Sequence, residues 1–188
     1  MFGALTKVTD IRKTRYVLPK TGGIYKWWCQ EELLDSFLRQ LKKHNAYVML
    51  DKNYVEVISF EGKTYYCFYV GKTDTSLHKR LKSQHIGKDG KKNPHLGRGI
   101  KRSTLRKSIN ALQNGAKVFD ENYVDAILNQ CLVQWEILSA EDIDKREKSE
   151  INSHIRILNR DDFEPLGDKS MESQRLAISV ALKEARKL

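Results

Sequence analysis

Strand-like and helix-like patterns alternate along this 188-residue chain, and the alternation limits the folds that it can adopt. The segment "GGIYKWWC" (22–29) follows turn residues and is rich in β-branched and aromatic side chains, which predicts a strand. Residues 31–44 repeat apolar side chains at helical spacing on one face. These side chains are Leu34, Phe37, Leu38 and Leu41.

More strand patterns follow along the chain. Residues 46–73 contain two or three strand-like runs, with a hairpin expected at Glu61 and Gly62. The run "CLVQWEIL" (131–138) predicts a late strand, with helices before and after it. The chain length suits one domain, so we predict a single mixed α+β domain.

Positive charge is concentrated in one segment. The chain has a net charge of +10, and residues 71–107 carry twelve lysines and arginines against two aspartates. Such a segment is typical of polyanion binding, because each neutralised phosphate releases condensed counterions. Charge alone therefore predicts a polyanionic partner, of which DNA and RNA are both examples. The candidate phosphate contacts are Lys72, Arg98, Arg102 and Arg106.

Three cysteines, Cys29, Cys67 and Cys131, lack a C-x-x-C spacing and are predicted to be buried free thiols. No apolar run approaches the roughly 20 residues that span a bilayer. The first residues also lack a secretory-signal pattern. We expect a soluble cytoplasmic protein with no membrane partner, either a monomer or a homodimer.

The segment "YVGKTD" (69–74) invites comparison with a phosphate-binding loop. That loop needs a glycine five residues before Gly71, where this chain has Tyr66. The histidines also lack zinc-finger spacing and have no cysteine pair beside them. The sequence therefore favours neither a nucleotide loop nor a zinc site.

A different set of polar residues suits phosphodiester hydrolysis. Tyr25 in "GGIY" and Tyr69 in "YVG" can approach one face of a sheet if their strands pair. Arg80 follows on a helix, and a distant acidic helix carries Glu147 and Glu150. A carboxylate can hold a divalent cation, a phenol can assist deprotonation of water, and arginine can stabilise charge in the transition state.

This ordered set resembles the GIY-YIG nuclease family over residues 22–25 and about 66–160. The resemblance implies a layered α/β/α domain around a small three-stranded antiparallel sheet, and DNA cleavage with Mg²⁺ or Mn²⁺. It also implies that Tyr25 activates water, Tyr69 positions the phosphate and Arg80 stabilises the transition state. His85 resembles a histidine often found one turn further on, here one residue further from Arg80 than usual.

The resemblance also ranks the two candidate metal ligands. In relatives the metal-binding glutamate tends to precede an aliphatic residue by four positions and an asparagine by about twelve. Ile151 and Asn159 occupy these positions relative to Glu147. Glu147 is therefore the favoured ligand, with Glu150 as the alternative.

The connection between the two tyrosine motifs departs from the family pattern. Relatives usually have a short turn there, whereas residues 26–68 intervene in this chain. An insertion is tolerable because the cost of loop closure grows slowly with length. We predict an N-terminal arm (1–21), a nuclease domain (22–165) with an insertion at about 30–63, and a C-terminal amphipathic helix (166–188). Its apolar residues, expected to cover the sheet or form a dimer interface, are Leu176, Ile178, Val180 and Leu182.

Two functions stay open at this point. One is a metal-dependent DNA endonuclease, and the other is a catalytically silent nucleic-acid-binding domain of the same fold. The second would follow if the insertion kept Tyr25 and Tyr69 apart. Both phenols, Arg80 and a carboxylate around one cleft would favour the enzyme.

Overall fold

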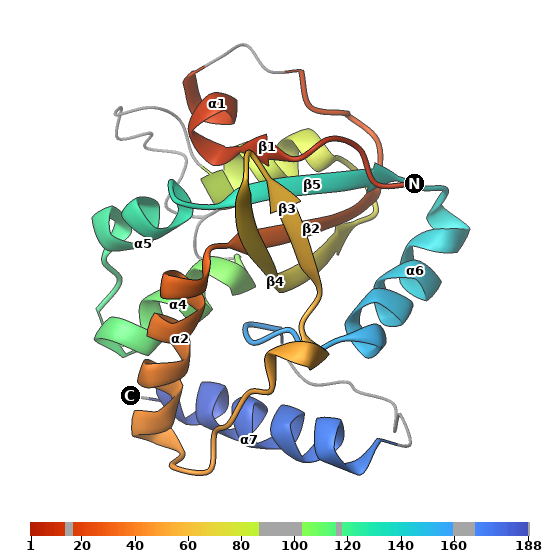
Figure 1. Cartoon of the computed structure of the whole chain (residues 1–188). Helices are drawn as coiled ribbons and strands as arrows, with labels where there is room; N and C mark the ends of the chain where they lie inside the picture. Colours follow the sequence, from red (N-terminus) through yellow and green to blue (C-terminus); the bar gives the residue numbers. More distant parts are fainter. Residues whose placement is uncertain (14–16, 87–102, 116–117, 160–167, 188) are drawn as a thin grey trace.

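One antiparallel sheet organises the computed structural model, which describes residues 1–13, 17–86, 103–115, 118–159 and 168–187 (Figure 1). The strand order is β1-β5-β2-β4-β3, and the sheet curls into a half-barrel. The strands are β1 (Thr6–Lys7), β2 (Gly23–Cys29), β3 (Val57–Phe60), β4 (Lys63–Thr73) and β5 (Leu132–Ile137).

The α+β class is confirmed, but the prediction of three strands is wrong. Strands β5, β2 and β4 form the expected antiparallel centre, and β1 and β3 extend it at its two edges. Strand β3 lies within the predicted insertion, where Ile58 and Phe60 pack against an apolar cluster around Trp28. The insertion therefore contributes a strand to the sheet itself.

The hairpin between β3 and β4 is confirmed at the predicted residues. Glu61 (φ 49°) and Gly62 (φ 74°) form a two-residue connection, and Phe60 pairs with Lys63 across it. Positive φ at both central residues is typical of a type I′ turn, whose twist matches that of the flanking strands. Glycine adopts such a φ at little cost.

The helices lie on both sides of the sheet. Helix α2 (Glu31–His44) packs against β4, and α6 (Ala140–Ser153) contacts β4 and β2 (Figure 1). Two further segments are the 3₁₀-helix η1 (Lys52–Tyr54) and the π-helix η2 (His78–Ile86). The α-helices are α1 (Val8–Lys13), α2 (Glu31–His44), α4 (Thr104–Asn114), α5 (Glu121–Leu128), α6 (Ala140–Ser153) and α7 (Lys169–Ala185).

The C-terminal helix packs on other helices rather than on the sheet. Its principal contacts are with α2 and α4, and it buries Ile178 and Leu182 there (Figure 1). Leu176 and Val180, which the sequence pattern assigns to the same apolar set as Ile178 and Leu182, are exposed. They lie four residues apart and so share the outer face of α7.

The interior follows the sequence pattern. Leu34, Phe37 and Leu41 of α2 are buried in the main core, as predicted. The three cysteines are buried and free, which confirms that prediction. No helix in the described ranges is both long and apolar enough to cross a membrane.

The chain after α6 completes an open edge of β4. Strand β3 pairs with residues 63–66, so within the described ranges β4 has no strand neighbour beside Val70 on that side. The Val70 N–H donates to Asn159 Oδ1 (2.8 Å), and Asn159 Nδ2 donates to the Val70 carbonyl (2.7 Å). The amide of Asn159 thus takes the place of a neighbouring strand next to Tyr69.

We expect Asn159→Ala to lower the free energy of unfolding by about 1–3 kcal/mol, because two buried backbone groups lose their partner. Asn159→Asp should also destabilise, because a carboxylate cannot donate to the Val70 carbonyl. Urea denaturation measures both effects. Asn122→Ala, at an exposed position of α5, is the control and should change stability by less than about 0.5 kcal/mol. Equal stability of Asn159→Ala and the control would contradict this role.

Candidate active site

The pairing of β2 with β4 brings the two tyrosines together. Tyr25 lies opposite Gly71, and Trp27 lies opposite Tyr69. Residues two apart in a strand share a face, so both phenols lie on the same side of the sheet. Their ring centroids are 6.4 Å apart. The long insertion therefore does not separate the two motifs.

The glycine of "YVG" is required by the phenol of "GIY". A Cβ atom on Gly71 would lie 2.6 Å from Tyr25 Oη and 2.7 Å from the ring carbon that bears it. Any side chain at Gly71 would displace the Tyr25 ring, which is fully buried. The two motifs thus fit each other sterically across the strand pair.

Arg80 and His85 both reach the Tyr25 hydroxyl from η2. Arg80 Nε donates to Tyr25 Oη (2.9 Å), and His85 Nε2 lies 2.8 Å from the same oxygen. In a π-helix the backbone hydrogen bonds join residues five apart, whereas in an α-helix they join residues four apart. A spacing of five therefore returns to the same side of η2. The unusual offset between Arg80 and His85 matches this wider helix.

Burial controls the protonation of this group. Burial, with the nearby Tyr69, raises the pKa of Tyr25 far above its ordinary value, so its phenol stays protonated. Burial also lowers the pKa of His85 well below its usual range, and the charges of Arg80 and Arg106 lower it further. The imidazole of His85 is therefore neutral at physiological pH.

A second layer of polar residues supports His85 from behind. Ser103 caps α4 by accepting from the Arg106 N–H (3.1 Å), and its Oγ lies 2.7 Å from His85 Nδ1. Arg106 Nη1 donates to the His85 carbonyl (2.7 Å) and to Asp125 Oδ1 (2.7 Å). The sequence predicted the cap at Ser103 but no link to His85, because 18 residues separate the two and no local pattern joins them.

The prediction that Arg106 contacts phosphate is corrected here. Only 1% of Arg106 is exposed, and its guanidinium is held by Asp125 and the His85 backbone, so it cannot lie against a nucleic acid. Arg98 and Arg102, the other two arginines proposed as phosphate contacts, lie outside the described residues.

A cleft of about 470 Å³ opens above the tyrosine pair. Tyr69, Arg80 and Glu147 line it together with Lys72 and Gln84. Tyr69 is 5% exposed, whereas Tyr25 is 0% exposed and lies one layer deeper. The structure therefore places Tyr69, Arg80 and two carboxylates, Asp74 and Glu147, at one cleft, with Tyr25 behind them.

Glu147 extends from α6 to the rim of this cleft. Its side chain is 19% exposed, and Lys72 Nζ lies 3.4 Å from Oε2. Burial raises the pKa of Glu147, and the charge of Lys72 offsets only part of this effect. Lys72 also forms an ion pair with Asp144, so it is shared between two acids of α6. The positive charge around Glu147 is thus too small to balance the negative charge of its carboxylate.

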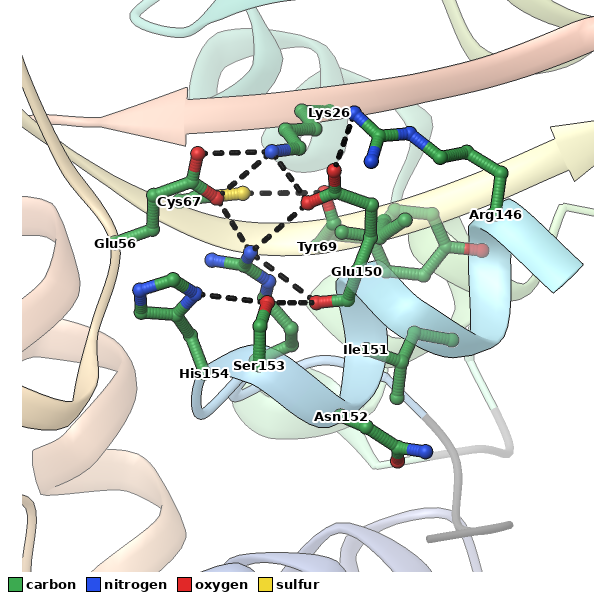
Figure 2. Close-up of polar contacts among 12 residues, drawn as sticks. Lys26, Glu56, Cys67, Tyr69, Arg146, Glu150, Ile151, Asn152, Ser153 and His154 are labelled. Carbon is green, nitrogen blue, oxygen red and sulfur yellow. Dashed lines mark hydrogen bonds and ion pairs between the residues drawn. The ribbon is translucent and has the colours of Figure 1, made fainter. Parts of the chain in front are cut away.

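Glu150 has the opposite environment (Figure 2). Lys26 Nζ lies 2.6 Å from its Oε2, and Arg146 Nη2 lies 3.0 Å from its Oε1. Arg156 is also close, and Figure 2 shows Glu56 on the other side of Lys26. These cations already balance the negative charge of the Glu150 carboxylate. A metal ion is therefore not needed there as a counter-charge.

Glu150 lies on the face of the sheet opposite the tyrosines, whereas Glu147 reaches the cleft that Tyr69 lines. Lys26 follows Tyr25 in β2, and neighbouring residues of a strand point to opposite faces. The ion pair between Lys26 and Glu150 joins α6 to the strand that carries Tyr25. One turn earlier on α6, Glu147 reaches the cleft.

The residues at the cleft fit a hard divalent cation. Within the described ranges, no group of three or more His, Cys, Asp or Glu side chains is arranged to hold a metal ion. Mg²⁺ is commonly bound by one or two carboxylates, with water and substrate phosphates as the other ligands. Glu147, partly exposed at an open cleft that Asp74 also lines, suits that mode of binding.

Tyr69, Arg80 and Glu147 thus line one cleft, and Tyr25 lies directly behind it. The family model described as the GIY-YIG catalytic domain matches residues 23–174, which is most of the chain. The protein belongs to the GIY-YIG family, whose members are endonucleases that act on nucleic acid. Among curated proteins and solved structures, none matches the chain significantly.

We expect Gly71→Ala to destabilise the fold by about 1–3 kcal/mol, because the new methyl group overlaps the Tyr25 phenol. Thermal and urea denaturation measure the change. Gly3→Ala is the matched control, since a Cβ atom there meets only an ordinary contact of 3.5 Å with the Trp135 carbonyl oxygen. A Gly71→Ala protein as stable as Gly3→Ala would show that the phenol is not tightly packed on this glycine.

Substitutions of the two glutamates should differ in their effect on the free energy of unfolding. Glu150→Gln removes a buried carboxylate that Lys26 and Arg146 share, whereas Glu56 and Glu136 remain as their other counter-charges, so we expect a loss of about 1–3 kcal/mol. Glu147→Gln should change stability by less than about 1 kcal/mol, because burial already disfavours its charged form. Urea denaturation at neutral pH compares the two variants. Equal losses would contradict the distinct roles assigned to these residues.

Proposed function

We propose that this protein is a metal-dependent DNA endonuclease that hydrolyses phosphodiester bonds at the cleft between η2 and α6. One observation carries the proposal: Tyr69, Arg80 and Glu147, from three separate segments, line the same cleft. The net charge of +10 adds support, because a polyanionic substrate requires a basic partner.

Each residue has a role that follows from its position. Arg80 lines the cleft and can stabilise negative charge on the phosphoryl group in the transition state. Tyr69 is the phenol that borders the cleft, so it is placed to orient the phosphate and the attacking water. Burial raises the pKa of Tyr69, whereas the charge of Arg80 and a hydrogen bond with Tyr25 lower it. Tyr25 therefore acts on the reaction through Tyr69 and Arg80.

Glu147 would hold the divalent cation, Mg²⁺ or Mn²⁺. When bound, the cation would neutralise charge on the phosphate and favour attack by water. Lys72 lies at the same rim and would contact a phosphate of the substrate. Glu150, occupied by Lys26 and Arg146, would keep α6 in place.

Cleavage of supercoiled plasmid with Mg²⁺ or Mn²⁺ tests the proposal. We expect nicking by the wild type that a chelator abolishes, and at least a 100-fold loss of rate in Arg80→Ala and Glu147→Gln. The matched controls are Arg39→Ala on α2 and Glu141→Gln on α6. Both residues are exposed and have no role in the proposed site, so these variants should keep the wild-type rate.

Salt-sensitive DNA binding without cleavage, across linear, branched and single-stranded DNA, would favour the silent binding domain. Where cleavage is seen, competition in the cleavage assay between unlabelled DNA and RNA of the same sequence identifies the substrate. Stronger inhibition of cleavage by RNA than by unlabelled DNA would overturn the assignment to DNA.

A further inference from the structure

A chain of hydrogen bonds runs from Ser103 to the tyrosine pair. Ser103 Oγ lies 2.7 Å from His85 Nδ1, and His85 Nε2 lies 2.8 Å from Tyr25 Oη. Ser103, His85 and Tyr25 are each 0% exposed, so bulk water does not reach them as a hydrogen-bond partner. The direction of each hydrogen bond therefore depends on the protein groups.

The hydroxyl of Ser103 decides the first direction. Its oxygen accepts from the Arg106 N–H (3.1 Å), and its own proton needs an acceptor. Within the described part of the chain, His85 Nδ1 is the one acceptor within hydrogen-bonding distance of this hydroxyl. A buried hydroxyl proton without an acceptor would cost about 1–3 kcal/mol. Ser103 therefore donates to His85 Nδ1.

The tautomer of His85 follows from this direction. A neutral imidazole carries one N–H, and Nδ1 is the acceptor, so the proton lies on Nε2 and points at Tyr25. The charges of Arg80 and Arg106 disfavour a second proton on the ring. The Tyr25 oxygen thus accepts two N–H groups, one from His85 and one from Arg80, and its own proton is donated to Tyr69.

We propose that Ser103 is a positioning residue that fixes His85 in the Nε2–H form, so that His85 donates to Tyr25 and does not accept its proton. Two donors on one phenol oxygen stabilise any negative charge that develops there. The tautomer is independent of the proposed function, whereas its effect on cleavage rests on that function.

Two substitutions test the assignment while keeping the helix cap. Ser103→Thr retains both the cap and the hydroxyl proton. Ser103→Asp also caps a helix but offers only acceptor oxygens when ionised, so it requires a proton on His85 Nδ1. Circular dichroism establishes that both variants are folded.

Long-range ¹H–¹⁵N NMR of protein labelled at histidine reads the tautomer directly, with His85→Gln used to assign the signal. We expect the Nε2–H form in the wild type and in Ser103→Thr, and a protonated Nδ1 in Ser103→Asp. Cleavage should be within about threefold of wild type in Ser103→Thr and fall about 100-fold in Ser103→Asp.

An Nδ1–H or doubly protonated ring in the wild type would overturn the assignment. An Nε2–H ring that persists in Ser103→Asp would equally remove the role of Ser103. A wild type with the Nε2–H ring that cuts no substrate would support the tautomer and count against the proposed function alone.

Discussion

The pairing of β2 with β4 is the constraint on which the rest of the site depends. Its register sets Tyr25 opposite Gly71, and the missing side chain at Gly71 leaves the space that the phenol occupies. A shift of one residue would turn Tyr25 to the other face of the sheet and place Lys26 beneath the cleft. Because both strand edges near the site are closed, by β5 on one side and by Asn159 on the other, this register is well determined.

Helix α6 then connects the two faces of the sheet. Its Glu150 is bound to Lys26 on the face away from the tyrosines, while its Glu147 reaches the cleft. A buried ion pair adds little net stability, because removing two charges from water offsets their attraction. What the pair contributes is a defined position for α6, since a shifted helix would leave buried charges unpaired. Glu147 can act at the cleft only if α6 is held in this defined position.

Local patterns were enough to predict much of this fold. The helix at 31–44, the hairpin at Glu61 and Gly62, the cap at Ser103 and the buried cysteines all depend on residues close together in the chain. The edge strand β1 has two residues, too few to show alternation, and its partner β5 is distant in sequence. Arg106 looked like a surface cation because nothing near it in sequence reveals its partner Asp125.

The π-helix explains why the site could be predicted only in part. Family spacing brought Arg80 and His85 into consideration together, but a spacing of five places two residues on one side only when the helix is wider than an α-helix. Isolated sequence cannot reveal that width, because a π-helix is stabilised by contacts around it. Here both Arg80 and His85 bind the Tyr25 hydroxyl, and Ser103 holds the His85 ring from behind. The π-helix η2 thus presents Arg80 and His85 on one side, and both side chains reach the same phenol oxygen.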